Sequence, residues 1–333
     1  MKHLQNSFTG KNAPWRYIAL IAAVYLAANT VGGIPLIIGM VSSTLKNPDA
    51  LSKLAQNPTD LSLLGIEPNL ALFMMLFPFL AGLISFIILI KPLNGRRFLD
   101  VITGSSSFRW KRVLISALTW ILISIIYYLL YRAVDPGNFR VNNLSSSLYP
   151  LIIVSVIFIP FQAMLEEVIF RAYLVQGFTV FSAGRRGFFG LVLFPVITSS
   201  LLFGIMHAWN PEIKAYGFLT MMPQYILFGL IFAITTVLDD GIEIAAGAHA
   251  ANNIFLSIMV TNSTSTLQTP AVFEQINIRP WVEFYSLLAV SVVFFFVMKT
   301  IFGWKDISLL WRKVDKIKAD SQTGYTELRS SDL

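Results

Sequence analysis

The sequence predicts an all-α membrane protein, a polytopic bundle of about eight transmembrane helices. Of its 333 residues, 55% are hydrophobic and only 13% are charged, whereas a soluble domain is usually about a quarter charged. The mean hydropathy is +0.67. The apolar residues also occur in blocks long enough to cross a bilayer, which takes roughly 20 residues per helix. A soluble globule of this size would lack the polar surface it needs.

Eight apolar blocks follow one another and define the expected spans. With soft boundaries they are 17–40, 69–90, 113–131, 151–176, 188–207, 215–238, 242–260 and 281–298. The first is too long for the apolar core of a cleavable signal peptide, so we interpret it as a span. The expected organisation is a single membrane domain in four parts. These are three N-terminal spans with their loops (1–150), a central group of helices (151–260), a last span (261–303) and a polar tail (304–333).

The positions of lysine and arginine predict the orientation. Eight spans place both termini on the same side of the membrane, and the segments on that side carry 18 of the 25 basic residues. The opposite segments carry 6, and Arg171 lies within a span. Because basic residues favour the cytoplasmic side, we expect a multi-pass protein of the plasma (inner) membrane with both termini in the cytoplasm.

Charge and cysteine content exclude several function classes. The net charge of +7 is distributed as an orientation signal between apolar blocks, so we expect a lipid bilayer and no nucleic acid as partner. The chain has no cysteine, which excludes disulfides, thiolate metal ligands and a cysteine nucleophile.

The fourth span contains three ionisable residues in an otherwise apolar stretch. Each such group costs roughly 2.5–3.5 kcal/mol on insertion scales, so it marks a candidate functional site. Glu167 and Arg171 are four residues apart and share a helix face, which predicts a structural ion pair. Glu166 is five residues from Arg171, about 140° around the helix, and is predicted to face a cavity instead.

Two of the three histidines lie in other spans. His207 ends the fifth span, and His249 shares a face of the seventh span with Asn253, four residues later. Read without a family, His207 could be an interfacial residue, and His249 and Asn253 could be an interhelical hydrogen-bond pair. Asn252 is interpreted as a packing residue, and His3, in the N-terminal tail, as incidental.

Three motifs in these spans resemble those of the CPBP family, which includes type II CAAX prenyl endopeptidases and bacteriocin-immunity (Abi) proteins. They are Glu166-Glu167-x-x-x-Arg171, Phe203-x-x-x-His207 and His249-x-x-x-Asn253. The resemblance covers roughly residues 150–260 and implies hydrolysis of a peptide bond in or beside the bilayer, in a membrane-associated protein or peptide substrate. The sequence lacks the short signatures of rhomboid-like serine, His-Glu-x-x-His zinc and presenilin-like aspartyl proteases.

Two mechanisms fit these residues. In a metal-free, glutamic mechanism Glu166 is the general base, His207 helps to orient and deprotonate a water, and His249 and Asn253 donate hydrogen bonds to the oxyanion. In the alternative, a zinc metalloprotease, His207, His249 and Glu166 hold the metal. The histidines lack the compact spacing of a zinc motif and Asn is a poor zinc ligand, so we favour a site without a cofactor.

Two non-enzymatic functions stay open at this point. Glu166, Glu167 and His207 could form the proton relay of a transporter, although the internal repeats common in transporters are not found. The chain could also be a non-catalytic immunity or scaffold protein, since family membership does not guarantee turnover.

The expected spans leave a gap in depth between two site residues. If the fifth span starts at residue 188, His207 lies about 28 Å above its start, whereas Glu166 lies about 18 Å above the connection near residue 178. A tilt, a bend near Pro195 or a later start of the fifth span is needed to close this gap of ~10 Å.

Overall fold

The computed structural model describes residues 1–56, 61–142 and 147–314, and these residues form an all-α bundle. The α-helices are α1 (Lys2–Gln5), α2 (Pro14–Asn29), α3 (Ile34–Lys46), α4 (Ala50–Gln56), α5 (Pro68–Asn94), α6 (Phe98–Ile102), α7 (Trp110–Val134), α8 (Leu148–Glu167), α9 (Val175–Ser182), α10 (Leu193–Met206), α11 (Pro211–Tyr216), α12 (Phe218–Asp239), α13 (Glu243–Met259) and α14 (Pro280–Phe302). A π-helical segment, η4 (Val168–Leu174), joins α8 to α9, and 3-10 turns cover Asn6–Phe8, Leu61–Leu64, Pro136–Asn138, Gly187–Gly190 and Ile307–Trp311.

The strands form one small sheet at an end of the bundle. They are β1 (Phe139–Val141), β2 (Val260–Thr261) and β3 (Phe273–Gln275), in the order β1-β3-β2. Strand β3 pairs antiparallel with β1 and parallel with β2. The sheet therefore links the segment after α7 to the long connection between α13 and α14.

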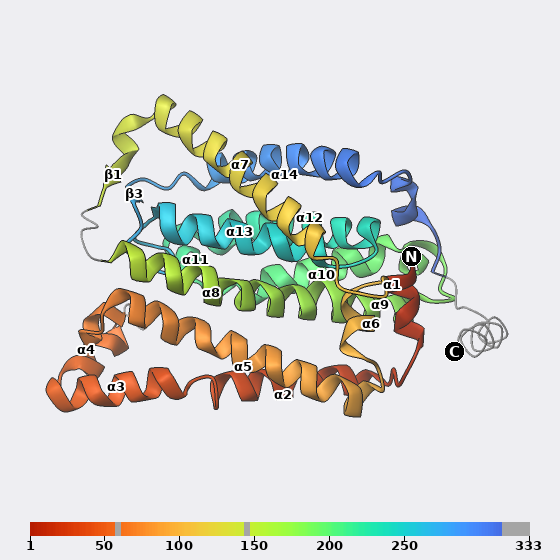
Figure 1. Cartoon of the computed structure of the whole chain (residues 1–333), viewed down its shortest axis with the longest axis horizontal. Helices are drawn as coiled ribbons and strands as arrows, with labels where there is room; N and C mark the ends of the chain where they lie inside the picture. Colours follow the sequence, from red (N-terminus) through yellow and green to blue (C-terminus); the bar gives the residue numbers. More distant parts are fainter. Residues whose placement is uncertain (57–60, 143–146, 315–333) are drawn as a thin grey trace.

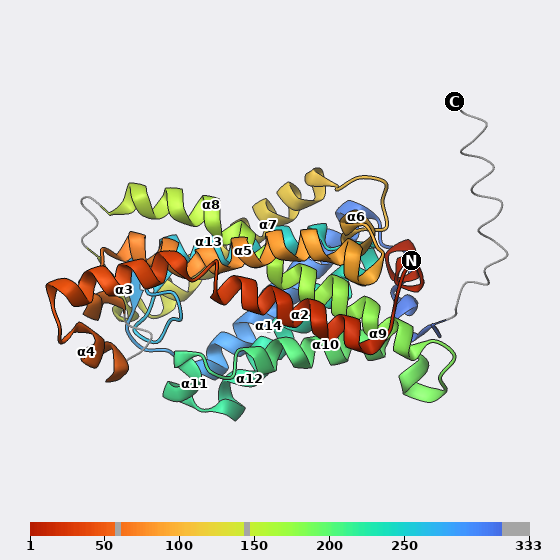
Figure 2. The same cartoon turned by 90° about the horizontal axis from the view of Figure 1, so that it is seen from below.

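The long helices run side by side along the longest axis of the molecule. Helices α7 and α14 lie along one side and α2, α3 and α5 along the opposite side, with α8, α10, α12 and α13 between them (Figure 1). The N-terminus, α1 and α6 lie at one end, whereas α3, α4 and the sheet lie at the other (Figure 1). Figure 2 shows α10, α11 and α12 together along one edge.

All eight predicted apolar blocks are helical, which confirms the polytopic bundle. Six helical segments are long and apolar enough to cross a membrane: Pro14–Lys46, Pro68–Asn94, Trp110–Val134, Leu148–Ser182, Phe218–Asp239 and Pro280–Phe302. The fifth and seventh blocks form shorter helices, α10 with 14 residues and α13 with 17. At 1.5 Å per residue α10 is about 21 Å long, less than the ~30 Å apolar layer of a bilayer.

The first predicted span is broken into α2 and α3. Pro35 lies in the first turn of α3, where its missing N–H leaves no helical hydrogen bond unmade. At the joint, a Cβ added to Gly32 would lie 2.5 Å from the Cα of Pro78 in α5. The break therefore lets the α2–α3 joint approach the backbone of α5 closely.

Small residues allow α13 to lie deep between its neighbours. Helix α13 packs against both α7 and α8. A Cβ at Gly247 would lie 2.3 Å from the carbonyl oxygen of Val113, so only glycine permits this approach of α13 to α7. Gly204 likewise allows α10 to contact Ile226 of α12. The buried face of α13 includes His249.

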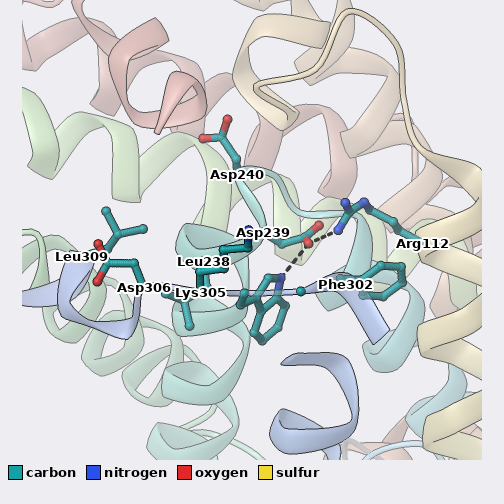
Figure 3. A pocket seen from close by; sticks show the side chains of 10 residues that line it. Arg112, Leu238, Asp239, Asp240, Phe302, Lys305, Asp306 and Leu309 are labelled. Atoms are coloured by element: carbon teal, nitrogen blue, oxygen red, sulfur yellow. Dashed lines mark hydrogen bonds and ion pairs between the residues drawn. The ribbon is translucent and has the colours of Figure 1, made fainter. Parts of the chain in front are cut away.

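A cluster of charged groups ties several helices together at the end near the N-terminus. Arg109 lies 2.6 Å from Glu243 and 3.1 Å from Asp239. Arg112 also pairs with Asp239, and the indole of Trp304 donates to the same carboxylate at 2.9 Å (Figure 3). A pocket of about 300 Å³ opens beside these groups (Figure 3). Basic residues counted as orientation signals thus also have structural partners.

The interpretation of His3 as incidental is wrong. Its side chain is fully buried, and its Nε2 lies 2.7 Å from the carbonyl oxygen of Val101. Its backbone N–H donates to Asp240, which adopts a left-handed conformation (φ 59°) at the end of α12. Sequence spacing gives no sign of this contact, because the two residues are 237 positions apart.

The first part of the predicted tail belongs to the packed body. Trp304, Leu310 and Val314 are buried, and the backbone N–H of Val314 donates to Gly190. The rest of the predicted tail, 315–333, lies outside the described residues.

Acid should loosen the docking of the N-terminus through His3. Burial lowers the pKa of His3 below its ordinary value of 6.5, against the opposing effect of Asp240. The folded state therefore favours neutral His3, so its contribution to stability is complete above about pH 6.5 and falls as the pH drops through the lower folded pKa. We expect the thermal unfolding midpoint in detergent to fall more on acidification for the wild type than for His3→Gln, which keeps an N–H donor. An equal loss in both proteins would assign the effect to another group.

Candidate active site

The expected ion pair between Glu167 and Arg171 is present. Arg171 Nη1 lies 3.2 Å from Glu167 Oε1, and the side chains are 1% and 0% exposed. The guanidinium of Arg171 also lies 3.8 Å from the ring centre of Phe203 on α10. A buried ion pair needs additional contacts to offset its desolvation, and the cation–π contact supplies one.

The π-helical segment begins directly after Glu167, a feature that the sequence did not predict. Such segments are rare and occur frequently at functional sites. The hydroxyl of Ser199 on α10 donates to the carbonyl oxygen of Phe170 within it. The altered helix is therefore attached to α10, the helix that carries His207.

His249 of α13 lies between the two glutamates of α8. Its Nδ1 is 2.7 Å from Glu167 Oε1, and its Nε2 is 3.7 Å from Glu166 Oε2. An ionised carboxylate can only accept, so Nδ1 carries the hydrogen that points to Glu167. Glu167 thus orients a histidine as well as pairing with Arg171, a contact that the sequence analysis did not foresee.

The two oxygens of Glu166 have different surroundings. Oε1 accepts a hydrogen bond from Gln162 Nε2, one turn earlier on α8. Oε2 faces His249 and has no hydrogen-bond partner among the described residues. The side chain is 15% exposed, against 0% for Glu167. The adjacent carboxylates are therefore distinguished by their contacts: Glu167 has two cationic or donor partners, and Glu166 has an oxygen available for a ligand.

Polar side chains from α13 and α7 extend the contacts of Glu166. Asn253 Nδ2 donates to Gln162 Oε1 at 2.9 Å, and Asn252 Nδ2 donates to Asn253 Oδ1 at 2.9 Å. Trp120 Nε1 on α7 donates to Asn252 Oδ1 at 3.2 Å. Neither Gln162 nor Trp120 was singled out from the sequence, although Gln162 is a polar residue one helical turn before Glu166.

His207 reaches this group through aromatic neighbours. Its Nδ1 lies 2.7 Å from the carbonyl oxygen of Phe203, which can only accept, so Nδ1 carries a hydrogen and Nε2 is the ring nitrogen left for other contacts. The Phe203 ring lies 4.5 Å from His207 and 6.3 Å from His249, between ring centres. Phe203 therefore contacts both histidines and Arg171. No hydrogen bond joins His207 to Glu166 among the residues that the structure describes.

The depth gap is largely closed by a later start of the fifth span. Helix α10 begins at Leu193, five residues after the predicted start at 188, which removes about 7.5 Å of rise. Phe203 packs against Phe170 with ring centres 5.3 Å apart. His207 follows Phe203 by one turn, and Glu166 precedes Phe170 by about one turn in the opposite direction along α8. Because the two helices are antiparallel, these steps bring both residues to a similar depth.

A second polar group, on the outer side of His207, was also missed. The Tyr225 ring of α12 stacks on His207 with centres 4.4 Å apart, and its hydroxyl donates to Glu212 on α11. Asn210 donates to the Tyr225 hydroxyl at 3.0 Å. A tyrosine in an otherwise apolar helix was the available signal, but its partner could not be read from spacing.

The zinc alternative does not fit this arrangement. Among the described residues, no group of three or more His, Asp or Glu side chains could hold a metal ion. Glu167 is engaged by Arg171 and His249. A catalytic zinc site needs three protein ligands and an open position, and these side chains do not converge on one point.

Comparison with known proteins supports the resemblance seen in the motifs. Residues 145–255 match the family model described as type II CAAX prenyl endopeptidase Rce1-like. The chain is also similar to the uncharacterized protein YyaK of Bacillus subtilis (strain 168), with 26% identity over 287 residues, covering 86% of this chain and 91% of that protein. No solved structure matches. The matched range contains Glu166, Glu167, His207, His249 and Asn253.

Removing both members of the buried ion pair should destabilise the protein by less than the sum of the two single removals. Glu167→Gln or Arg171→Met leaves an uncompensated buried charge, at a cost of roughly 3–5 kcal/mol. The double variant leaves neither, so its loss should be smaller than the sum of the single losses. A double-mutant cycle on thermal unfolding in detergent measures this difference, and strict additivity would contradict the pairing.

Proposed function

We propose that this chain, a member of the CAAX-protease-like family, is an intramembrane endopeptidase in which Glu166 activates a water for peptide hydrolysis. The observation that carries the proposal is the pair of facing polar atoms, Glu166 Oε2 and His249 Nε2, 3.7 Å apart. Both atoms can contact one reacting carbonyl group or the water that attacks it. Oε2 has no hydrogen-bond partner in the described part of the chain, so it is the available basic oxygen.

Glu166 acts as the general base in this mechanism. Oε2 accepts a proton from the water while the water oxygen bonds to the carbonyl carbon, and the C=O electron pair moves to the carbonyl oxygen. The protonated carboxyl then delivers this proton to the leaving amine as the C–N bond breaks. His207 orients the water through Nε2, because its Nδ1 is fixed by the carbonyl oxygen of Phe203.

His249 and Asn253 stabilise the negative charge that develops on the carbonyl oxygen. Glu167 fixes the His249 ring through Nδ1, which leaves Nε2–H directed to the side of Glu166. The amide nitrogen of Asn253 carries two hydrogens, and Gln162 accepts one of them. Donors held in place in a dry site are effective oxyanion stabilisers.

We place this site in the plasma membrane with the N-terminal end of the bundle in the cytoplasm. His3 contacts Asp240, and Val314 contacts Gly190, so both ends of the described chain lie at the end where the basic connections gather. The substrate is a membrane-associated protein or peptide. Prenylated CAAX peptides, named in the description of the matching family, are the first class to test.

Glu166→Gln should abolish proteolysis in a folded protein. The amide cannot accept the proton from water, and loss of a general base typically costs at least about 100-fold in rate. The measurement is cleavage of a quenched fluorescent, farnesylated CAAX peptide in proteoliposomes, alongside proteomic comparison of membranes holding either protein. Glu283→Gln is the matched control, because Glu283 is a carboxylate of α14 bonded to Tyr127 and Gln275, outside this site. Near-full turnover by Glu166→Gln would reject the assignment.

Activity should be independent of metal. The contacts of Glu167 and His207 leave no three convergent ligands in the described chain. We expect purified protein to hold well under one zinc per chain and to keep its activity after exhaustive chelation. Stoichiometric zinc, with activity lost on removal and regained on return, would instead make the histidines ligands.

A further inference from the structure

A run of hydrogen bonds with a single direction ends on the carboxylate of Glu166. Trp120 donates to Asn252, Asn252 to Asn253, Asn253 to Gln162, and Gln162 to Glu166 Oε1. The run crosses three helices, α7, α13 and α8. We propose that this chain of donors positions Glu166 and holds it ionised, which makes Gln162, Asn252 and Trp120 positioning residues of the site. The inference rests on the proposed role of Glu166 as the general base.

The two ends of the run fix its direction. The indole N–H of Trp120 can only donate, and an ionised carboxylate can only accept. Each of the three amides between them accepts through its oxygen and donates through its nitrogen. Reversing any amide would bring two donors or two acceptors face to face. The orientation of every member therefore follows from its neighbours.

A proton on Glu166 Oε1 would conflict with this arrangement. The O–H would face the N–H of Gln162, and flipping Gln162 would carry the mismatch along the run to the Trp120 N–H. Trp120 is 1% exposed and Gln162 is 9% exposed, so water gives little compensation at these positions. A hydrogen bond to a charged group in such surroundings is among the stronger ones. The run therefore favours the ionised carboxylate and leaves Oε2 as the oxygen that takes a proton.

The other titratable neighbours of Glu166 do not donate a hydrogen bond to its Oε1 atom. The other titratable groups around it are His249, Glu167, Arg171, Tyr225 and, on the water of the proposed mechanism, His207. His249 lies on the Oε2 side, Arg171 contacts Glu167, and the Tyr225 hydroxyl donates to Glu212. Helix α5, which also packs on α8, has no titratable residue in 68–90. Gln162 is thus the donor to Oε1, and its removal should change the protonation of Glu166 directly.

Aromatic packing of Trp120 can be separated from its hydrogen bond. Its ring contacts Phe228, Phe232 and Phe294, with centres 5.0–6.0 Å apart. Trp120→Phe keeps an aromatic ring there and removes the N–H. Gln162→Met keeps the side-chain length and removes both amide atoms. The matched control is Ser155→Ala, which breaks a 2.9 Å hydrogen bond to Ser257 between the same helices, α8 and α13, outside the run.

The test is a titration of Glu166 itself, which needs no substrate. Infrared difference spectra of the purified protein in nanodiscs are recorded against pH, and the carboxyl band missing from Glu166→Gln is assigned to Glu166. We expect its midpoint to rise by about one to two pH units in Gln162→Met, because a hydrogen bond to the charged form is lost. Trp120→Phe should shift it in the same direction by less, and Ser155→Ala should leave it unchanged.

The outcomes separate this inference from the proposed function. An unchanged midpoint in Gln162→Met, or in Trp120→Phe where Gln162→Met does not fold, would overturn it. An equal rise of the Glu166 midpoint in Ser155→Ala would mean that loosened helix packing causes the shift, and this would also overturn the inference. The expected shifts without any peptide cleavage would support the positioning run while rejecting the peptidase. Peptide cleavage that depends on Glu166, without the expected midpoint shifts, would support the peptidase and reject the positioning run.

Discussion

The buried carboxylate of Glu167 is the contact on which the site depends. It forms an ion pair with Arg171 at 3.2 Å and accepts a hydrogen bond from His249 at 2.7 Å, so it joins α8 and its π-helical extension to α13. Arg171 in turn lies on the ring of Phe203, which fixes α10 at the same depth. In an apolar bundle these groups have few alternative partners, and a charge left alone there is costly. Satisfying one buried glutamate therefore sets the relative positions of three helices.

The length of α10 and the close packing of α13 bring the two histidines near the glutamates. Helix α10 is too short for a full span, and it ends at Met206, directly before His207 and at a depth similar to that of the glutamates. Helix α13 is held close to α7 by Gly247, where a Cβ would meet the carbonyl oxygen of Val113 at 2.3 Å. Close packing excludes lipid and water from the space between helices, which strengthens the electrostatic interactions within it. The helices that depart from ordinary spans are thus the ones that carry the histidines.

The sequence predicted the parts of this structure that follow from local spacing. A separation of four residues placed Glu167 with Arg171. Contacts between distant segments could not be predicted in this way. His3 and Asp240 are 237 positions apart, and Gln162 and Asn253 are 91 apart. The π-helical segment was missed because it is stabilised by a neighbouring helix through Ser199 and has no periodic signature of its own.

Two adjacent glutamates can have different roles because a helix turns by about 100° from one residue to the next. Glu167 points to Arg171 and is fully buried, whereas Glu166 points away from that arginine and keeps 15% exposure. A general base must be ionised, must reach water and must lie close to the group that stabilises the oxyanion. In the proposed mechanism the donors on Oε1 serve the first requirement, the 15% exposure of the Glu166 side chain the second, and His249, which Glu167 holds, the third. Glu166 therefore depends on Glu167, because Glu167 fixes His249, the histidine that faces Glu166.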